Sequence, residues 1–194
     1  MQVSELVRTF EGVRQQCVWI QSCFETNRDL FGAGTGRHEV MRRTASGFFG
    51  DLNRILYEYY ILQVCKLTDP PETRKRENLT VAHLDSLLVK YGLWTQQIGE
   101  LSEGLHRYRE VIVVARNRAI SHSDKETALA FVEYGAHTKQ EAEAFLDYMH
   151  DYISVVGDAC GARPLDFRST TGPGDVSDLF RALNGGAWVP PDNR

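Results

Sequence analysis

Apolar side chains recur at steps of three and four residues through long stretches of this chain, and this spacing constrains the fold more than any other feature. Such spacing places the apolar residues on one face of an α-helix. No segment shows the sustained alternation of a β-strand, and no internal repeat is present. The sequence therefore predicts an all-α fold, a bundle of about five helices. In the first stretch, the spaced residues are Leu6, Phe10, Val13, Cys17, Ile20 and Phe24.

Turn and capping residues mark where the expected helices begin and end. Proline disfavours helix in the residue before it, so Asp69, Pro70 and Pro71 end the second helix. Gly92 suits the C-cap of the third helix, and Thr138 with Glu141 forms a capping-box pattern that opens the fifth. The expected helices cover residues 3–30, 38–67, 80–91, 95–121 and 138–156.

The second helix has apolar and aromatic residues on more than one face. A helix with such wide apolar coverage is contacted on more than one side. We therefore expect it at the centre of the bundle or at a dimer seam. The residues that give this coverage are Leu52, Ile55, Leu56, Tyr59, Tyr60, Leu62 and Val64.

The chain length and the composition of its end predict one domain with an appendage. A chain of 194 residues supports a single globular core. From Gly161 onward the sequence is rich in Pro, Gly, Ser and Asp. We expect a helical domain at 1–160 and a less ordered C-terminal tail at 161–194, with one short helix near 178–183.

The first residues and the apolar runs indicate where the protein resides. The N-terminal segment is amphipathic and charged from Glu5 onward, unlike a signal peptide. No apolar run approaches the roughly 20 residues that a membrane span requires. We expect a cytoplasmic protein of bacterial type that does not associate with membranes.

The cysteines do not form a metal-binding or disulfide pattern. Cys17, Cys23, Cys65 and Cys160 stand apart, with no CxxC pair. The first three fall within expected helices, which favours buried, reduced thiols. No close pairing of cysteine and histidine has the spacing of zinc ligands. We expect neither a metal ion nor another cofactor.

The segment 111–124, VIVVARNRAISHSD, contains the residues that indicate chemistry. An apolar helical run leads into Arg116 and Asn117, and His122 follows six residues after the arginine. Arginine is permanently cationic and binds phosphate oxygens, while histidine exchanges a proton near neutral pH. An enzyme that cleaves a phosphodiester without a metal needs both abilities in one place.

This segment resembles the Arg–polar–x4–His motif of HEPN domains, which are all-α bundles. Residues 67–70, Leu-Thr-Asp-Pro, close a long aromatic helix, and residues 78–80, Asn-Leu-Thr, open the next one. With the late helix that ends in RNRAISHSD, this arrangement is similar to the HEPN-like proteins of the bacterial abortive-infection group. The resemblance covers roughly residues 1–157 and leaves out the tail.

The resemblance implies a metal-independent RNA endonuclease, in phage defence or as the toxin of a toxin–antitoxin pair. Arg116 and His122 would be the catalytic pair, with Asn117 as the polar residue that supports them. Such domains usually form homodimers in which two copies of the motif face each other across one cleft. The implied partners are an RNA substrate, a second copy and an antitoxin. DNA would be inert because it lacks the 2′-hydroxyl nucleophile.

Helix geometry gives a reason for the second copy. At about 100° per residue, six steps place Arg116 and His122 roughly 120° apart and about 9 Å along the axis. The two side chains do not converge on one straight helix. Either the helix deforms near Ser121 or a second chain supplies the complementary group, and we favour the second chain.

Other interpretations of these residues remain open. Arg118, His122 and Asp124 also fit a solvated ion cluster at a helix end, without catalysis. A non-catalytic HEPN-like module that binds RNA, a nucleotide or a protein partner is the alternative function, and a purely structural helical protein is a third.

Basic residues outside the motif are candidates for substrate binding. The net charge of −4 argues against a broad electrostatic affinity for nucleic acid, so a local patch must supply any RNA contact. We assign substrate binding to Arg118, Arg42 and Arg43. A solvated helix face is the other interpretation of Arg42 and Arg43.

Overall fold

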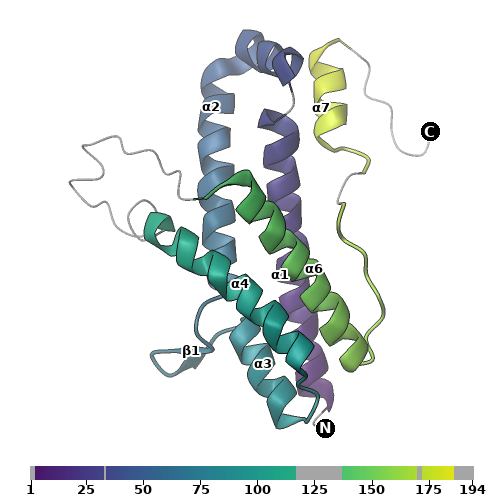
Figure 1. The fold of residues 1–194 in the computed structure, drawn as a ribbon. Helices are drawn as coiled ribbons and strands as arrows, with labels where there is room; N and C mark the ends of the chain where they lie inside the picture. Colours follow the sequence, from purple (N-terminus) through teal and green to yellow (C-terminus); the bar gives the residue numbers. More distant parts are fainter. Residues whose placement is uncertain (1–2, 33, 117–136, 170–171, 186–194) are drawn as a thin grey trace.

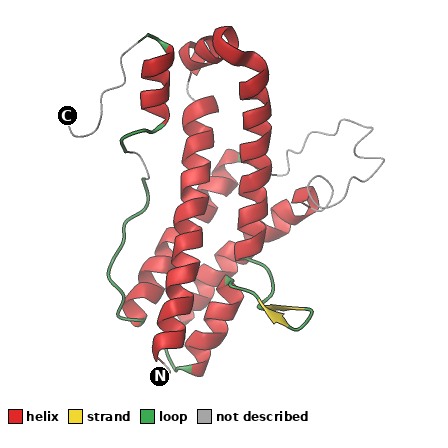
Figure 2. Ribbon diagram, turned by 180° about the vertical axis from the view of Figure 1, so that it is seen from behind, coloured by secondary structure: helices red, strands yellow, loops and turns green. Residues whose placement is uncertain are grey.

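The computed structural model describes residues 3–32, 34–116, 137–169 and 172–185, and these residues form a mostly helical bundle (Figure 1). Two long helices pack side by side, and two shorter ones, α4 and α6, cross this pair on one side. Seen from behind, the α1–α2 pair lies in front (Figure 2). The helices are α1 (Val3–Phe31), α2 (Gly34–Leu67), α3 (Val81–Lys90), α4 (Gln96–Ala115), α6 (Lys139–Ala159) and α7 (Val176–Leu183).

The predicted starts of the third, fourth and fifth helices are confirmed, because local capping determines them, while the predicted end of the fourth helix at residue 121 lies outside the described residues. The side chains of Thr80 and Thr95 accept hydrogen bonds from backbone N–H groups in the first turns of α3 and α4. The capping box of Thr138 and Glu141 is present at the start of α6. Gly92 follows the C-cap of α3 with a φ of 70°, a conformation that glycine adopts without strain.

The second helix differs from its prediction in two ways. It begins at Gly34, before the expected start at residue 38, and it is broken at Ala45, whose φ of −162° and ψ of 70° are not helical. Ser46 and Gly47 follow directly, and both are weak helix formers. The first part of α2 therefore turns away from the long straight part (Figure 1).

A short hairpin connects α2 to α3 where the sequence predicted only a loop. Strands β1 (Glu72–Thr73) and β2 (Arg76–Glu77) pair in antiparallel fashion. Arg74 and Lys75 form the turn with φ values of 51° and 65°, the conformation typical of two-residue hairpins.

One apolar core joins α1, α2, α3, α4 and α6. A buried polar cluster fixes three of these helices to one another. Asp85 of α3 accepts hydrogen bonds from Ser102 of α4 and from Tyr152 of α6, both at 2.6 Å. Burial raises the pKa of Asp85, and the two hydrogen bonds oppose this rise. The largest fully buried side chains include Phe10, Ile20, Ile61, Leu84, Leu105, Phe145 and Tyr152.

The described residues after Gly161 pack against the bundle. Phe167 is buried, and the carbonyl of Arg163 accepts a hydrogen bond from Arg14 of α1 at 2.8 Å. The short helix predicted near 178–183 is α7, and Phe180 of α7 joins a second, smaller apolar cluster with α1 and α2.

None of the helices in the described part of the chain combines the length and the apolar character that crossing a membrane requires.

Candidate functional site

Arg116, the first residue of the motif, lies at the C-terminal end of α4. Its backbone is still helical, with φ −56° and ψ −47°, and its N–H donates to the carbonyls of Ile112 and Val113. Its side chain is half-buried. Asn117, Arg118 and His122 lie outside the described residues, so their predicted roles stay predictions.

A second arginine, Arg109, shares the face of α4 that carries Arg116. The two residues are seven apart, which is about two helical turns and returns to nearly the same direction. The positive charges of both arginines interact electrostatically with the thiol of Cys65, near the end of α2. Burial raises the pKa of Cys65, while the charges of Arg109 and Arg116 lower it. The pair of arginines therefore faces the C-terminal end of α2.

One carboxylate, that of Asp69, accompanies the two arginines. Asp69 accepts a hydrogen bond from Nη2 of Arg109 at 2.8 Å, and the two side chains are 29% and 24% exposed. The other terminal nitrogen of Arg109, Nη1, is buried and has no hydrogen-bond partner among the residues that the structure describes. The Asp69–Arg109 ion pair therefore joins α4 to the end of α2.

The Leu-Thr-Asp-Pro segment anchors α2 at this site. Leu67 is fully buried, and the hydroxyl of Thr68 donates to the carbonyl of Val64 at 2.8 Å. Asp69 then binds Arg109, and Pro70 ends the helix. In the sequence, this segment marked a helix stop within the family resemblance, and the ion pair with Arg109 was not predicted. The seven-residue spacing of Arg109 and Arg116 indicated that these two share a face, but not that Asp69 binds one of them.

Aromatic residues beside the site surround His137, which directly precedes α6. The imidazole of His137 stacks on Tyr57 with 5.7 Å between ring centroids, and Tyr108 packs against its edge. Burial lowers the pKa of His137, which favours the neutral ring. A cavity of about 440 Å³ opens here, lined by Phe24, Tyr57, Tyr60 and His137 among others. Sequence analysis had assigned no role to His137.

The basic residues Arg42 and Arg43 lie far from Arg116 along α2. Arg42 binds Glu39 through two hydrogen bonds, and Arg43 donates to the side chain of Asn184. Both precede the break at Ala45, and from Gly47 to Cys65 alone the helix runs about 27 Å at 1.5 Å per residue. Within one protomer, these two residues do not extend the site at Arg116.

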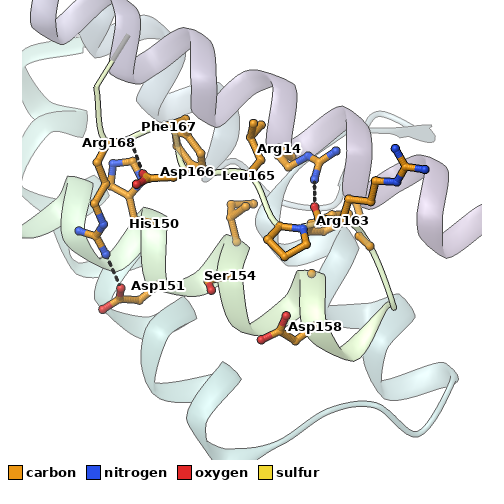
Figure 3. Close-up of a pocket in the computed structure, with 15 residues that line it drawn as sticks. Arg14, His150, Asp151, Ser154, Asp158, Arg163, Leu165, Asp166, Phe167 and Arg168 are labelled. Carbon is orange, nitrogen blue, oxygen red and sulfur yellow. Dashed lines mark hydrogen bonds and ion pairs between the residues drawn. The ribbon is translucent and has the colours of Figure 1, made fainter.

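A separate crevice lies between α6, α1 and the segment after Gly161 (Figure 3). It measures about 230 Å³. Arg168 binds Asp147 and Asp151 of α6, at 3.3 and 2.8 Å. His150 is buried and shares a hydrogen bond with Gln21 at 3.2 Å. These polar groups bind one another, so the crevice fixes the C-terminal segment to the bundle.

The helical bundle, with Arg116 at the end of α4, agrees with the fold class that the sequence predicted. A model of the HEPN family described as AbiU2 matches residues 4–179, which is most of the chain. The chain belongs to this abortive-infection family of HEPN domains. The match continues past Gly157, where the sequence analysis ended the resemblance, and it includes the packed segment after Gly161. Comparisons with curated proteins and with solved structures give no match.

Proposed function

We propose that this protein is a metal-independent RNA endonuclease that acts as a cytoplasmic homodimer, in phage defence or as the toxin of a toxin–antitoxin pair. Membership of the AbiU2 family supports the defence role. The single observation that carries the chemistry is the position of Arg116, at the end of α4 on the face that also carries Arg109, where both charges act on Cys65 near the end of α2.

The proposed reaction is an attack by the ribose 2′-hydroxyl oxygen on the adjacent phosphorus. His122 removes the proton of that hydroxyl, or protonates the 5′-oxygen as it leaves. Arg116 stabilises the negative charge that grows on the phosphoryl oxygens. The bond from phosphorus to the 5′-oxygen breaks, and the products are a 2′,3′-cyclic phosphate and a 5′-hydroxyl.

Each residue predicted at the site has its own role in the proposed reaction. Asn117 supports the pair, Arg118 binds the substrate backbone, and Arg116 begins the site on the described part of α4. Because Arg42 and Arg43 lie at the other end of α2, they contact RNA only where the substrate is long or where a second copy places them near the cleft.

The test is cleavage of a labelled RNA by the full chain, in buffer and in excess chelator. Arg116→Ala and His122→Ala should each abolish cleavage in both conditions, while circular dichroism shows an unchanged helix content. Arg107→Ala is the matched arginine control, since Arg107 lies on the same helix and binds only Tyr148 among the contacts described. Retention of cleavage in either motif variant contradicts the proposal, as does cleavage of DNA of the same sequence.

The alternative function is a non-catalytic module that binds RNA, a nucleotide or a protein partner. The placement of Arg109 and Arg116 on one face of α4 favours it, because two neighbouring cations attract a phosphate without further chemistry. In this case His122→Ala leaves RNA affinity almost unchanged, whereas Arg116→Ala weakens it in a salt-dependent way. An antitoxin or another protein partner would be found by co-purification from the native host.

A further inference from the structure

The cavity beside His137 has no part in the reaction proposed for Arg116 and His122, and we call it the aromatic cavity. Its volume of about 440 Å³ lies within the range of cavities that bind small molecules, roughly 300–1,000 Å³. Its lining comes mainly from α1, α2 and the start of α6 (Figure 1). The aromatic rings of the lining are those of Phe24, Phe31, Tyr57, Tyr60 and His137.

The rings of the aromatic cavity are held in place by one another and by α4. The ring planes of His137 and Tyr57 are within 7° of parallel, and the ring of Phe24 packs against that of Tyr60 with 5.7 Å between centroids. The hydroxyl of Tyr60 donates to that of Tyr108 on α4 at 3.3 Å. Because these rings are fixed before a ligand arrives, binding costs them little conformational entropy. The aromatic cavity therefore offers flat, preformed surfaces.

Flat aromatic walls with polar groups between them suit a planar ring whose edge is polar. Unpaired RNA bases are bound in this way, stacked on aromatic side chains and hydrogen-bonded along their edges. The amide of Asn27 and the hydroxyl of Tyr57 also belong to the lining, and both can donate and accept hydrogen bonds. The amide nitrogen of Asn27 donates to the side chain of Asn53 at 3.1 Å, which fixes the orientation of the amide. The chemistry of the lining is therefore that of a base-binding site.

Two cations line the aromatic cavity, and they differ in their partners. Arg28 binds Asp29 at 3.0 Å and lies 3.7 Å from Glu25, so its charge is used within the protomer. The ammonium of Lys139 lies 3.5 Å from Glu143, and its side chain is 72% exposed. Because ion pairs so exposed to water are weak, Lys139 can exchange this carboxylate for a phosphate. The ligand that these groups fit is a planar base joined to a phosphate.

Helix α4 connects the aromatic cavity to the site at Arg116. Tyr108 of α4 packs against the edge of His137, with 5.6 Å between ring centroids. Arg116 follows eight residues later on the same helix, about 12 Å along its axis. A base in the aromatic cavity would therefore belong to a nucleotide close to the phosphate at Arg116.

We propose that the aromatic cavity binds one unpaired base of the RNA substrate, stacked against its aromatic wall, with Lys139 on the adjoining phosphate. The inference rests on the proposed function, since it names the part of the RNA that a second site recognises. Contacts to phosphate position a nucleic acid but do not distinguish bases, so the aromatic cavity supplies the choice of base that Arg116 cannot make. The expected substrate is a single-stranded segment or a loop, because a paired base cannot enter.

Binding of short RNA chains to the full protein tests the proposal. The probes are labelled ribose–phosphate chains in which only the central nucleotide has a base, either A, C, G or U, and one chain without any base. Fluorescence anisotropy should show that at least one base tightens binding by roughly tenfold, the usual effect of one stacked base. Tyr57→Leu should remove this gain and keep the affinity for the chain without a base. Tyr91→Leu is the matched control, because Tyr91 is also half-buried but caps α3 outside the aromatic cavity.

A second variant keeps the test decisive if Tyr57→Leu disturbs the fold. Asn27→Trp fills the aromatic cavity and removes none of its rings, so it should also abolish the gain from a base, while circular dichroism shows an unchanged helix content. No gain from any base in the wild-type chain overturns the proposal and favours an aromatic side chain of a protein partner as the occupant. A gain that survives in both variants also overturns it. A free nucleoside monophosphate that binds as tightly as the RNA chain, and loses affinity in Tyr57→Leu, overturns the assignment to RNA.

Cleavage by the same preparations separates this proposal from that of the nuclease. If the chain cleaves RNA but gains no affinity from a base, only the base-binding proposal fails. If a base tightens binding but no RNA is cleaved, only the nuclease proposal fails. When both hold, Tyr57→Leu should raise KM and leave kcat nearly unchanged, because the base contact binds the substrate before and during the reaction alike.

Discussion

Two clusters of arginine and aspartate lie in different parts of the bundle, and they differ in how their charges are balanced. At the end of α4, Arg109 binds one carboxylate, that of Asp69, and Arg116 lies on the same face of the helix. In the crevice of Figure 3, Arg168 binds two carboxylates of α6. Among the ion pairs of the described residues, Arg109 therefore has one carboxylate partner and Arg168 has two.

This difference separates a site from a structural contact. A guanidinium that binds one carboxylate keeps a donor for a phosphate, such as Nη1 of Arg109, whereas one held between two carboxylates keeps fewer. The two clusters also differ in burial. The side chains of Arg109 and Asp69 are about three-quarters buried, whereas those of Arg168, Asp147 and Asp151 are more than half exposed. The comparison therefore predicts larger effects on stability and on RNA binding at the end of α4.

The largest effect is expected from Asp69→Ala. The change leaves Arg109 partly buried beside Arg116 with no carboxylate, which should lower the free energy of unfolding by about 1–3 kcal/mol. Urea unfolding measures this loss, and Asp69→Asn should restore part of it because the amide oxygen still accepts a hydrogen bond. A loss no larger than that of Asp147→Ala in the crevice would remove the distinction between the clusters.

RNA affinity should depend on Arg109 and not on Arg168. Arg109→Ala should weaken RNA binding by roughly tenfold and reduce the slope of log K against log salt by about 1, because one phosphate contact is lost. Fluorescence anisotropy over a range of salt concentrations measures both quantities. Equal losses for Arg109→Ala and Arg168→Ala would mean that charge balance does not predict phosphate binding here.

The stability of both regions should fall as the pH drops below neutrality. Burial lowers the pKa of His106, which lies near Arg109, and that of His150 in the crevice, both from an ordinary value of 6.5. The unfolded chain therefore binds protons more readily, so the stabilisation is complete above about pH 6.5 and decreases as the pH falls through that value. Urea unfolding at about pH 7.5 and about pH 5.5 measures the decrease.

Histidine variants show which side chains cause this pH dependence of stability. His106→Gln and His150→Gln should each remove part of it. The aspartates around His150 raise its pKa and oppose the effect of burial. An unchanged pH dependence in both buried-histidine variants would contradict this explanation.

The smallest effect is expected from Arg168→Ala. Its ion pairs are exposed to water and screened by salt, so their loss should cost less than about 1 kcal/mol of unfolding free energy. Thermal unfolding at low and high salt measures it, and the difference from wild type should shrink at high salt. A loss of unfolding free energy as large as that of Asp69→Ala would mean that the contacts in the crevice contribute as much to stability as those at the end of α4.

Features that depend on neighbouring residues in the chain were predictable. The capping box at Thr138, the glycine after α3 and the stop at Pro70 act within one or two helical turns, so their residue types suffice. The family was also recognisable, because Arg116 and residues 67–70 have a characteristic order and spacing.

Features that depend on residues distant in the chain were not predictable from the sequence. The bond between Asp69 and Arg109 joins residues 40 positions apart, and that between Gln21 and His150 joins residues 129 apart. Nothing in the local pattern specifies such partners. The placement of Arg42 and Arg43 away from Arg116 also follows from the long straight part of α2, which local composition does not reveal.

The sequence by itself determined that the chain is helical, where most helices begin and end, and which family its motif belongs to. Periodicity and capping are local, so the order of residues contains them fully. Only the tertiary structure decided that Asp69 binds Arg109 and that the segment after Gly161 packs on the bundle. These features depend on which apolar faces pack against one another, and that is determined by the packing of the whole molecule.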